Sequence, residues 1–363
     1  MAEVTKALIE EAIKGYVEPH MGKNLIDAKC VKTVDINGGN VDVTVELGFP
    51  ADGIKDELAG AVKEMVASVD GVSSININVG WKVVAHSVQK SLKPIDNVKN
   101  IIAVASGKGG VGKSTTAVNL ALALAADGAK VGILDADIYG PSQPRMLGVS
   151  GQPESKDGKS LEPMENYGLQ AMSIGFLVDE ETPMIWRGPM VTQALEQLLN
   201  DTNWTDLDYL VIDLPPGTGD TQLTLAQKVP VSGAVIVTTP QDIALLDARK
   251  GFKMFEKVEV PILGIVENMS IHICSNCNHE EHIFGEGGGN RMAEQYGVDF
   301  LGALPLDIRI REETDGGKPT VVAEPESRIS QIYREIGRKT AARLALQAKS
   351  YASKFPNIVI QNN

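Results

Sequence analysis

The chain has 363 residues, and its 47 acidic against 34 basic side chains give a formal net charge of -13. This acidity argues against general nucleic-acid binding, which needs a basic face. No apolar run approaches the length of a membrane span, and the first residues lack a signal-peptide pattern. Its 3 cysteines do not form a disulfide framework, because one is far from the other two. We therefore expect a cytoplasmic protein with neither nucleic acid nor a membrane as a partner.

Residues 1–85 are predicted to form a small α+β domain without an evident catalytic or metal-binding cluster. Cys30, at a strand start, is expected to pack as a small apolar side chain. The polar residues 86–99 are predicted to be a linker to the next domain. Apolar spacing predicts helices over Glu3–Lys14 and Asp52–Ser68, and strands over Lys29–Ile36, Val41–Leu47 and Val72–Val79.

Residues 100–350 are predicted to form an α/β domain with a mostly parallel sheet covered by helices on both faces. The basis is an alternation of apolar strands with helical segments. The remaining residues, 351–363, are predicted to be a C-terminal tail. Strands are predicted at residues 101–105, 130–134, 169–174, 208–213, 233–238, 261–266 and 299–304.

A basic amphipathic helix is predicted over Ser327–Lys349. Ile329, Ile332, Tyr333 and Ile336 fall on one side of it, with basic residues nearby. Such a helix either lies on a membrane or packs its apolar stripe on its own domain. We expect it to pack on its own domain.

A glycine-rich loop separates the strand at 101–105 from an Ala/Leu-rich helix. Its sequence matches Gly-x-x-x-x-Gly-Lys-Ser, the P-loop pattern, in the strand–loop–helix context that the pattern requires. The glycines let backbone N–H groups point at a polyphosphate, Lys113 reaches the β- and γ-phosphates, and Ser114 ligates Mg²⁺. We expect this P-loop NTPase domain to bind a nucleoside triphosphate through Gly107, Lys108, Gly109, Gly110, Val111, Gly112, Lys113, Ser114 and Thr115.

Carboxylates follow two other predicted strands. Asp213 ends the apolar run 208–213, a Walker B pattern, and is expected to hold Mg²⁺ directly or through water. Asp135 and Asp137 follow the strand at 130–134. The carboxyl ends of parallel strands meet at one edge of a sheet, so these residues are expected beside the P-loop. The alternative for Asp135 and Asp137 is a pair that caps the next turn.

Cys274 and Cys277 form a Cys-x-x-Cys pair, followed by His279 and His282. Three interpretations are open: a redox pair, a zinc site completed by the two histidines, and an iron–sulfur cluster. A cubane cluster needs four thiolates, whereas one chain offers this pair plus the distant Cys30. Two copies related by a two-fold axis offer Cys274 and Cys277 twice, and we expect this bridging arrangement.

The P-loop carries a second lysine, Lys108, and thereby resembles the deviant Walker A ATPases. The chain also contains Asp-Ala-Asp-Ile-Tyr-Gly-Pro-Ser, Asp-Leu-Pro-Pro-Gly-Thr-Gly-Asp and Glu-Asn-Met-Ser, in that order before the cysteine pair. With its small N-terminal domain, which is similar to one found in iron–sulfur assembly ATPases, nearly the whole chain resembles the Mrp/ApbC-type iron–sulfur cluster carrier ATPases.

The resemblance implies a cytosolic homodimer that binds ATP and a labile [4Fe–4S] cluster, hydrolyses ATP slowly and transfers the cluster to apo-proteins. Cluster-assembly scaffold proteins are implied as further partners. Lys108 would contact the nucleotide of the other subunit, Asp137 would orient the attacking water, and Asn268 would read adenine. The alternatives are a MinD/ParA-like positioning ATPase, a zinc-binding P-loop ATPase, and an electron-transfer ATPase similar to the nitrogenase iron protein.

Overall fold

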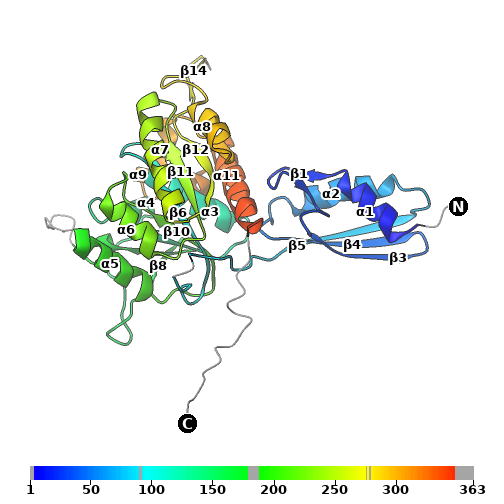
Figure 1. Ribbon diagram of the computed structural model, residues 1–363, viewed down its shortest axis with the longest axis horizontal. Helices are drawn as coiled ribbons and strands as arrows, with labels where there is room; N and C mark the ends of the chain where they lie inside the picture. The colour runs from blue at the N-terminus through cyan, green and yellow to red at the C-terminus, as the bar shows by residue number, and fades with distance from the viewer. Residues whose placement is uncertain (1–3, 90–91, 179–187, 275, 278, 348–363) are drawn as a thin grey trace, which may run out of the picture.

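The computed structural model describes residues 4–89, 92–178, 188–274, 276–277 and 279–347, in which a small N-terminal domain lies beside a larger α/β domain (Figure 1). In the small domain, two helices cover one face of a three-stranded sheet. Strand β4 pairs antiparallel with β3 and parallel with β5. The elements are α1 (Lys6–Lys14), β1 (Val17–Glu18), β2 (Lys23–Asn24), β3 (Val31–Asn37), β4 (Asn40–Leu47), α2 (Lys55–Ala67) and β5 (Ser74–Trp81).

Alternation along β4 explains how this small domain buries a core. Val41, Val43 and Val45 are buried, whereas Asp42 between them is exposed, because successive side chains of a strand point to opposite faces. Cys30 is buried, as expected for a small apolar side chain. The predicted helices and strands of this domain are present, and the short pair β1–β2 was not predicted.

The larger domain is built on an eight-stranded sheet with the order β15-β12-β11-β6-β10-β7-β9-β8. All seven predicted strands are present and parallel, and every residue of β7, β10 and β11 is buried. Such apolar runs are typical of parallel strands covered on both faces. An eighth strand, β8, was not predicted and pairs antiparallel with β9. The strands are β6 (Val98–Ala105), β7 (Val131–Asp135), β8 (Met164–Asn166), β9 (Leu169–Ser173), β10 (Leu207–Asp213), β11 (Gly233–Thr238), β12 (Ile262–Glu267) and β15 (Phe300–Ala303).

Helices cover both faces of this sheet, as predicted. Helices α3 and α11 pack together on one face, and α5, α6, α7 and α8 cover the other. A short hairpin, β13 (His272–Ile273) with β14 (Glu280–Glu281), projects beyond the sheet. The helices are α3 (Lys113–Ala126), α4 (Gln143–Met146), α5 (Gly188–Asn200), α6 (Asp220–Lys228), α7 (Asp242–Lys257), α8 (Gly288–Tyr296), α9 (Ile308–Asp315), α10 (Thr320–Ala323) and α11 (Arg328–Ala345), with a 3₁₀ turn at Ile174–Phe176.

Helix α11 packs its apolar stripe on its own domain. Ile329, Tyr333 and Ile336 are buried, and the helix contacts α3, β12 and β15. Ser327 caps its N-terminus by accepting a hydrogen bond from the backbone N–H of Ser330. This confirms the expected packing over the membrane-surface alternative. Within the described ranges, no helix is both long and apolar enough to span a bilayer.

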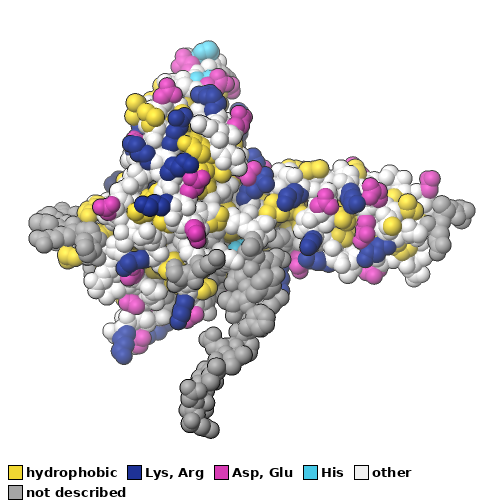
Figure 2. Space-filling view, in the orientation of Figure 1, with side chains coloured by type: hydrophobic (Ala, Val, Ile, Leu, Met, Phe, Trp, Pro, Cys, Tyr) yellow, Lys and Arg dark blue, Asp and Glu magenta, His cyan; other side chains and the backbone are white. Residues whose placement is uncertain are grey.

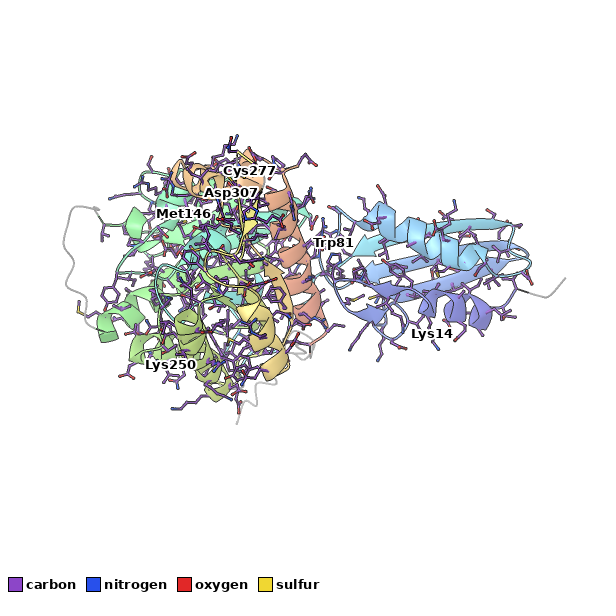
Figure 3. All side chains as sticks on the ribbon, turned by 90° about the horizontal axis from the view of Figure 1, so that it is seen from above. Lys14, Trp81, Met146, Lys250, Cys277 and Asp307 are labelled. Atoms are coloured by element: carbon purple, nitrogen blue, oxygen red, sulfur yellow. The ribbon has the colours of Figure 1, made fainter. Side chains whose placement is uncertain are left out.

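The two domains meet at the C-terminal end of the P-loop helix α3. Asp127, which follows α3, is buried and accepts hydrogen bonds from Arg338 Nε at 2.7 Å and Arg334 Nη2 at 3.1 Å. Its backbone O accepts from the backbone N–H of Asp52 in the small domain at 3.2 Å. Trp81, labelled at this junction in Figure 3, donates its Nε1–H to Asp52. One helix thus joins the P-loop to the neighbouring domain.

A buried histidine forms a second bridge between the domains. His20 lies 2.6 Å from Glu18 Oε1 through Nδ1 and 3.0 Å from Glu335 Oε2 through Nε2. Burial lowers the pKa of His20, but hydrogen bonds to Glu18 and Glu335 outweigh burial and raise the pKa to about 9. The pKa of Glu335 is lowered to about 2, chiefly by its hydrogen bond to His20. His20 is therefore a cation at neutral pH.

Replacing His20 by glutamine is expected to reduce the free energy of unfolding by about 2 kcal/mol at pH 7, and by almost nothing at pH 10. The folded pKa of about 9 exceeds the unfolded value of 6.5. The stabilisation is therefore complete below pH 6.5 and disappears as the pH rises through 9. Urea denaturation at both pH values measures the difference.

The control is Glu10→Gln, which removes an exposed pair between Lys6 and Glu10. Such surface pairs contribute little, so this variant should unfold as the parent does at both pH values. An equal loss for His20→Gln at pH 7 and pH 10 would show that the charge of the imidazole does not stabilise the interface.

Candidate functional site

The P-loop lies at the carboxyl end of the central strand β6, between β10 and β11. Gly110 and Gly112 have φ angles of 79° and 82°, a region that favours glycine. A Cβ at Gly112 would clash with the side-chain amide of Asn268, and one at Gly107 with the backbone of Asp247. The glycines of the pattern are thus required by backbone conformation and by close approach.

The loop borders an open cavity of about 220 Å³. Its walls come from the P-loop, from the segment after β7 and from the segment after β10, as expected for strand ends that meet at one edge. Met146, labelled in Figure 3, lies on one wall. The lining residues are Ser106, Lys108, Gly109, Gly110, Gly112, Lys113, Ser114, Thr115, Asp137, Met146 and Pro216.

Lys113, Ser114 and Asp213 are brought together, as the sequence predicted. The buried ammonium of Lys113 forms a short ion pair with Asp213 Oδ1 and lies 3.1 Å from Ser114 Oγ. Asp213 is fully buried at the end of β10. Hydroxyl and carboxylate oxygens are the ligands that Mg²⁺ prefers, so Ser114 and Asp213 fit the ion that accompanies a nucleoside triphosphate.

The two aspartates after β7 have different positions. Asp135 is fully buried and accepts hydrogen bonds from the backbone N–H groups of Asp137, Ser142 and Gln143 at 3.1, 2.9 and 3.0 Å. Asp135 therefore caps the following turn, the alternative considered for the pair. Asp137 is only partly buried and lines the cavity beside the P-loop.

The pKa values of these aspartates follow from burial. Burial raises the pKa of Asp135 to about 7, with a further contribution from the charge of Asp213, and backbone N–H groups oppose this. Burial also raises the pKa of Asp137, while the nearby ammonium of Lys113 lowers it. A carboxylate with a raised pKa accepts hydrogen bonds more strongly, which suits contact with a water molecule.

Gln143, at the start of α4, also belongs to this cluster, although the sequence analysis did not single it out. Its Nε2 donates to Asp213 Oδ2 at 2.9 Å and to the backbone O of Ser114 at 3.2 Å. No spacing rule marks a glutamine at this position, because its role depends on a contact with a residue 70 positions away.

Lys108 and Asn268 have different surroundings at the P-loop. Lys108 lines the cavity, and its backbone O accepts a hydrogen bond from Ser106 Oγ. Asn268 is buried, and its Nδ2 donates to the backbone O of Val111 at 2.9 Å. The amide therefore supports the P-loop backbone. Its predicted contact with adenine and the predicted contact of Lys108 with a second subunit stay predictions.

The cysteine pair lies on the β13–β14 hairpin at one end of the large domain, where Figure 3 labels Cys277. Cys277 is exposed and Cys274 is partly exposed. Backbone N–H groups of Asn276 and Cys277, followed by the Cys277 thiol, lower the pKa of Cys274. The thiolate is the form that ligates metals, so this environment favours metal binding.

The two histidines near this pair have other partners. The ring Nδ1 of His282 lies 2.9 Å from the backbone O of Ser270. The exposed ring of His279 lies 3.8 Å from Glu281, and Figure 2 shows histidine side chains on the surface above β14. Among the side chains placed by the structure, no group of three His, Cys, Asp or Glu residues is arranged to hold a metal ion.

Comparison with known families gives two matches. A family described as the NUBPL iron-transfer P-loop NTPases matches residues 97–341, and one described as iron–sulfur cluster assembly proteins matches residues 6–79. The iron–sulfur cluster carrier protein of Escherichia coli K12 is 51% identical over 96% of this chain and 94% of its own length. That of Pseudomonas fragi is 62% identical over 75% of this chain and 95% of its own length.

Solved structures show the same fold. A nucleotide-binding protein of Archaeoglobus fulgidus, in complex with ADP, is 40% identical, with a TM-score of 0.56 over 64% of this chain and 90% of that chain. A further relative found by sequence, the mouse iron–sulfur cluster transfer protein NUBPL, is 48% identical over 86% of this chain and 95% of its own length. The resemblance inferred from the motifs is confirmed. The chain belongs to the family of NUBPL iron-transfer P-loop NTPases.

Proposed function

We propose that this chain binds Mg–ATP, hydrolyses it slowly, and carries a labile [4Fe–4S] cluster between two copies of itself for transfer to apo-proteins. The observation that carries the proposal is the Cys274–Cys277 pair, partly exposed at Cys274 and exposed at Cys277, on a hairpin of a P-loop NTPase domain. The carrier and transfer names of the relatives support the same cargo. Apo iron–sulfur proteins and cluster-assembly scaffold proteins are the proposed partners, in the cytoplasm.

The nucleotide half of this proposal rests on the cavity beside the P-loop. Lys113 would leave Asp213 to contact the β- and γ-phosphates, while Ser114 and Asp213 would hold Mg²⁺. Asp137 lines the same cavity and would orient the attacking water. Lys108, also at the cavity, would supply positive charge to the nucleotide of the second copy. Each role places an existing side chain near developing charge, which is how most phosphoryl transfer is catalysed.

The cargo half rests on the number of thiolates. One chain offers Cys274 and Cys277 at the hairpin, and Cys30 is buried in the other domain. Two copies supply the four thiolates of a cubane cluster. Because both cysteines of a chain are near the surface, the cluster would be bound at an accessible site, as transfer to another protein requires.

A surface between the hairpin and the P-loop is suited to a second copy. The first turns of α7 expose Ile243 and Leu246 by 65% and 51%, and Ile283, two residues after β14, is 53% exposed. Gly107 of the P-loop packs against the same helix at Asp247. Exposed apolar side chains gathered near two sites of one molecule are typical of interaction surfaces. A homodimer through this face would cover both sites.

Anaerobic reconstitution with iron and sulfide tests the proposal, followed by absorption spectroscopy and counts of iron, sulfide and zinc. About four irons and four sulfides per dimer are expected, and incubation with an apo [4Fe–4S] enzyme should restore that enzyme's activity. About one zinc per chain, with no bound cluster, would instead support the zinc alternative and contradict the carrier function.

A further inference from the structure

Gln143 is held rigidly between two strands of the central sheet. Its side chain is 1% exposed. Its backbone N–H donates to Asp135, at the end of β7, and its side-chain Nε2 donates to Asp213, at the end of β10. The same Nε2 also contacts the backbone O of Ser114. Gln143 thus touches Ser114 and Asp213, the two residues that are suited to hold Mg²⁺.

The other end of this amide has no hydrogen-bond partner among the described residues. Gln143 Oε1 is buried and accepts no hydrogen bond from any residue that the structure describes, and the same holds for Oγ of the adjacent Ser142. An unsatisfied buried polar group costs about 1–3 kcal/mol. Such groups are rare in folded proteins, and each calls for an explanation such as a bound ion or its water ligands.

We propose that Gln143 is a positioning residue for the Mg²⁺ that accompanies the nucleotide, with its amide oxygen accepting hydrogen bonds from water ligands of the ion. Mg²⁺ usually keeps several of its waters in protein sites, so acceptors around that shell contribute to affinity. The Nε2 group meanwhile keeps the carboxylate of Asp213 in place. This inference rests on the proposed Mg–ATP site and adds a residue that no P-loop motif assigns.

Two substitutions separate the acceptor role from a merely structural one. Gln143→Met keeps the approximate volume of the side chain but removes both polar atoms. Gln143→Glu removes the donor to Asp213 and keeps acceptor oxygens. If the oxygen of Gln143 supports the ion, methionine should weaken metal binding and glutamate should preserve it. If only the donor to Asp213 matters, both variants should weaken it.

The measurement is a titration of the full-length protein with Mn²⁺ in the presence of ADP, followed by electron paramagnetic resonance, with a parallel Mg²⁺ competition. Gln143→Met should raise the dissociation constant of the metal about 10- to 100-fold, the usual effect of losing an outer-shell partner. Fluorescent ADP binding in excess EDTA should change less than about 2-fold, because the phosphate contacts of the loop remain. Circular dichroism at each step confirms that the variants are folded.

Three results would overturn the inference: unchanged metal affinity in Gln143→Met, equal weakening in Gln143→Glu, or a loss of ADP binding in EDTA. A failure of the proposed nucleotide site is distinguishable, since the unsubstituted protein would then bind neither ADP nor Mn²⁺–ADP. Normal binding by the unsubstituted protein, combined with an unaffected methionine variant, would reject the role of Gln143 alone.

Discussion

Replacing Lys113 by alanine is expected to reduce ATP hydrolysis by at least about 10²- to 10³-fold, the usual effect of removing one group that stabilises the transition state. Lys113 is a buried cation paired with Asp213, and in the P-loop pattern it neutralises charge on the transferred phosphate. Steady-state phosphate release and equilibrium binding of labelled ATP measure the effect. Cluster delivery to an apo-enzyme should fall as well, if ATP drives transfer.

The same substitution has a second consequence for the folded protein. Without Lys113, the buried carboxylate of Asp213 loses its cation and stays near the carboxyl group of Asp135. Removing one partner of a buried ion pair typically destabilises a protein by about 3–5 kcal/mol, unless the remaining group is protonated. Thermal unfolding should therefore be measured alongside hydrolysis, so that loss of activity is not confused with loss of structure.

The control for this experiment is Lys14→Ala on α1, labelled in Figure 3. Its side chain is 44% exposed and forms a surface pair with Glu11 one helical turn away. Such pairs contribute little, so hydrolysis and stability should match the parent protein. A folded Lys113→Ala variant that hydrolyses ATP at the parental rate would contradict the proposed site.

Much of the fold follows from local sequence patterns. The seven parallel strands of the large sheet are continuous apolar runs, and the P-loop pattern is contiguous, so both are visible in the sequence. Strand β8 has only 3 residues, and β1 and β2 have 2 each, too short for a periodic signal. The proximity of Lys113 and Asp213 was also predictable, because strand ends of a parallel sheet share one edge.

What the sequence did not reveal depends on contacts between distant residues. His20 and Glu335 are 315 positions apart, and their bridge exists only because the two domains meet there. Gln143 resembles any glutamine at a helix start until β10 brings Asp213 beside it. The separate positions of Asp135 and Asp137 likewise depend on how the following turn folds back onto the end of β7.

The P-loop helix α3 links the nucleotide cavity to the junction between the two domains. Its first residue, Lys113, lies at the nucleotide cavity, and Asp127 after its last residue contacts the small domain and α11. The hairpin with the cysteines, β13–β14, follows β12 and projects beyond the sheet. The nucleotide cavity and the cysteine pair are therefore built from separate segments, and each can be altered without removing a residue of the other.

Replacing Cys274 or Cys277 by alanine is accordingly expected to remove the cluster while leaving ATP affinity within about 2-fold of the parent, since no phosphate-contacting group changes. Each single variant leaves two thiolates per dimer instead of four, too few for a cubane cluster. Iron and sulfide counts after anaerobic reconstitution, with fluorescent ATP binding on the same samples, measure both properties.

Cys30→Ala is the matched control, because it also removes one thiol from each chain. Cys30 is 5% exposed and packs in the core of the small domain, so its loss should leave the cluster in place. Full cluster retention in Cys274→Ala or Cys277→Ala would contradict the ligand assignment. Equal cluster loss in Cys30→Ala would mean that the small domain takes part in holding the cargo. Either the Cys30 thiolate would then ligate the cluster, or the small domain would be needed to form the cluster site.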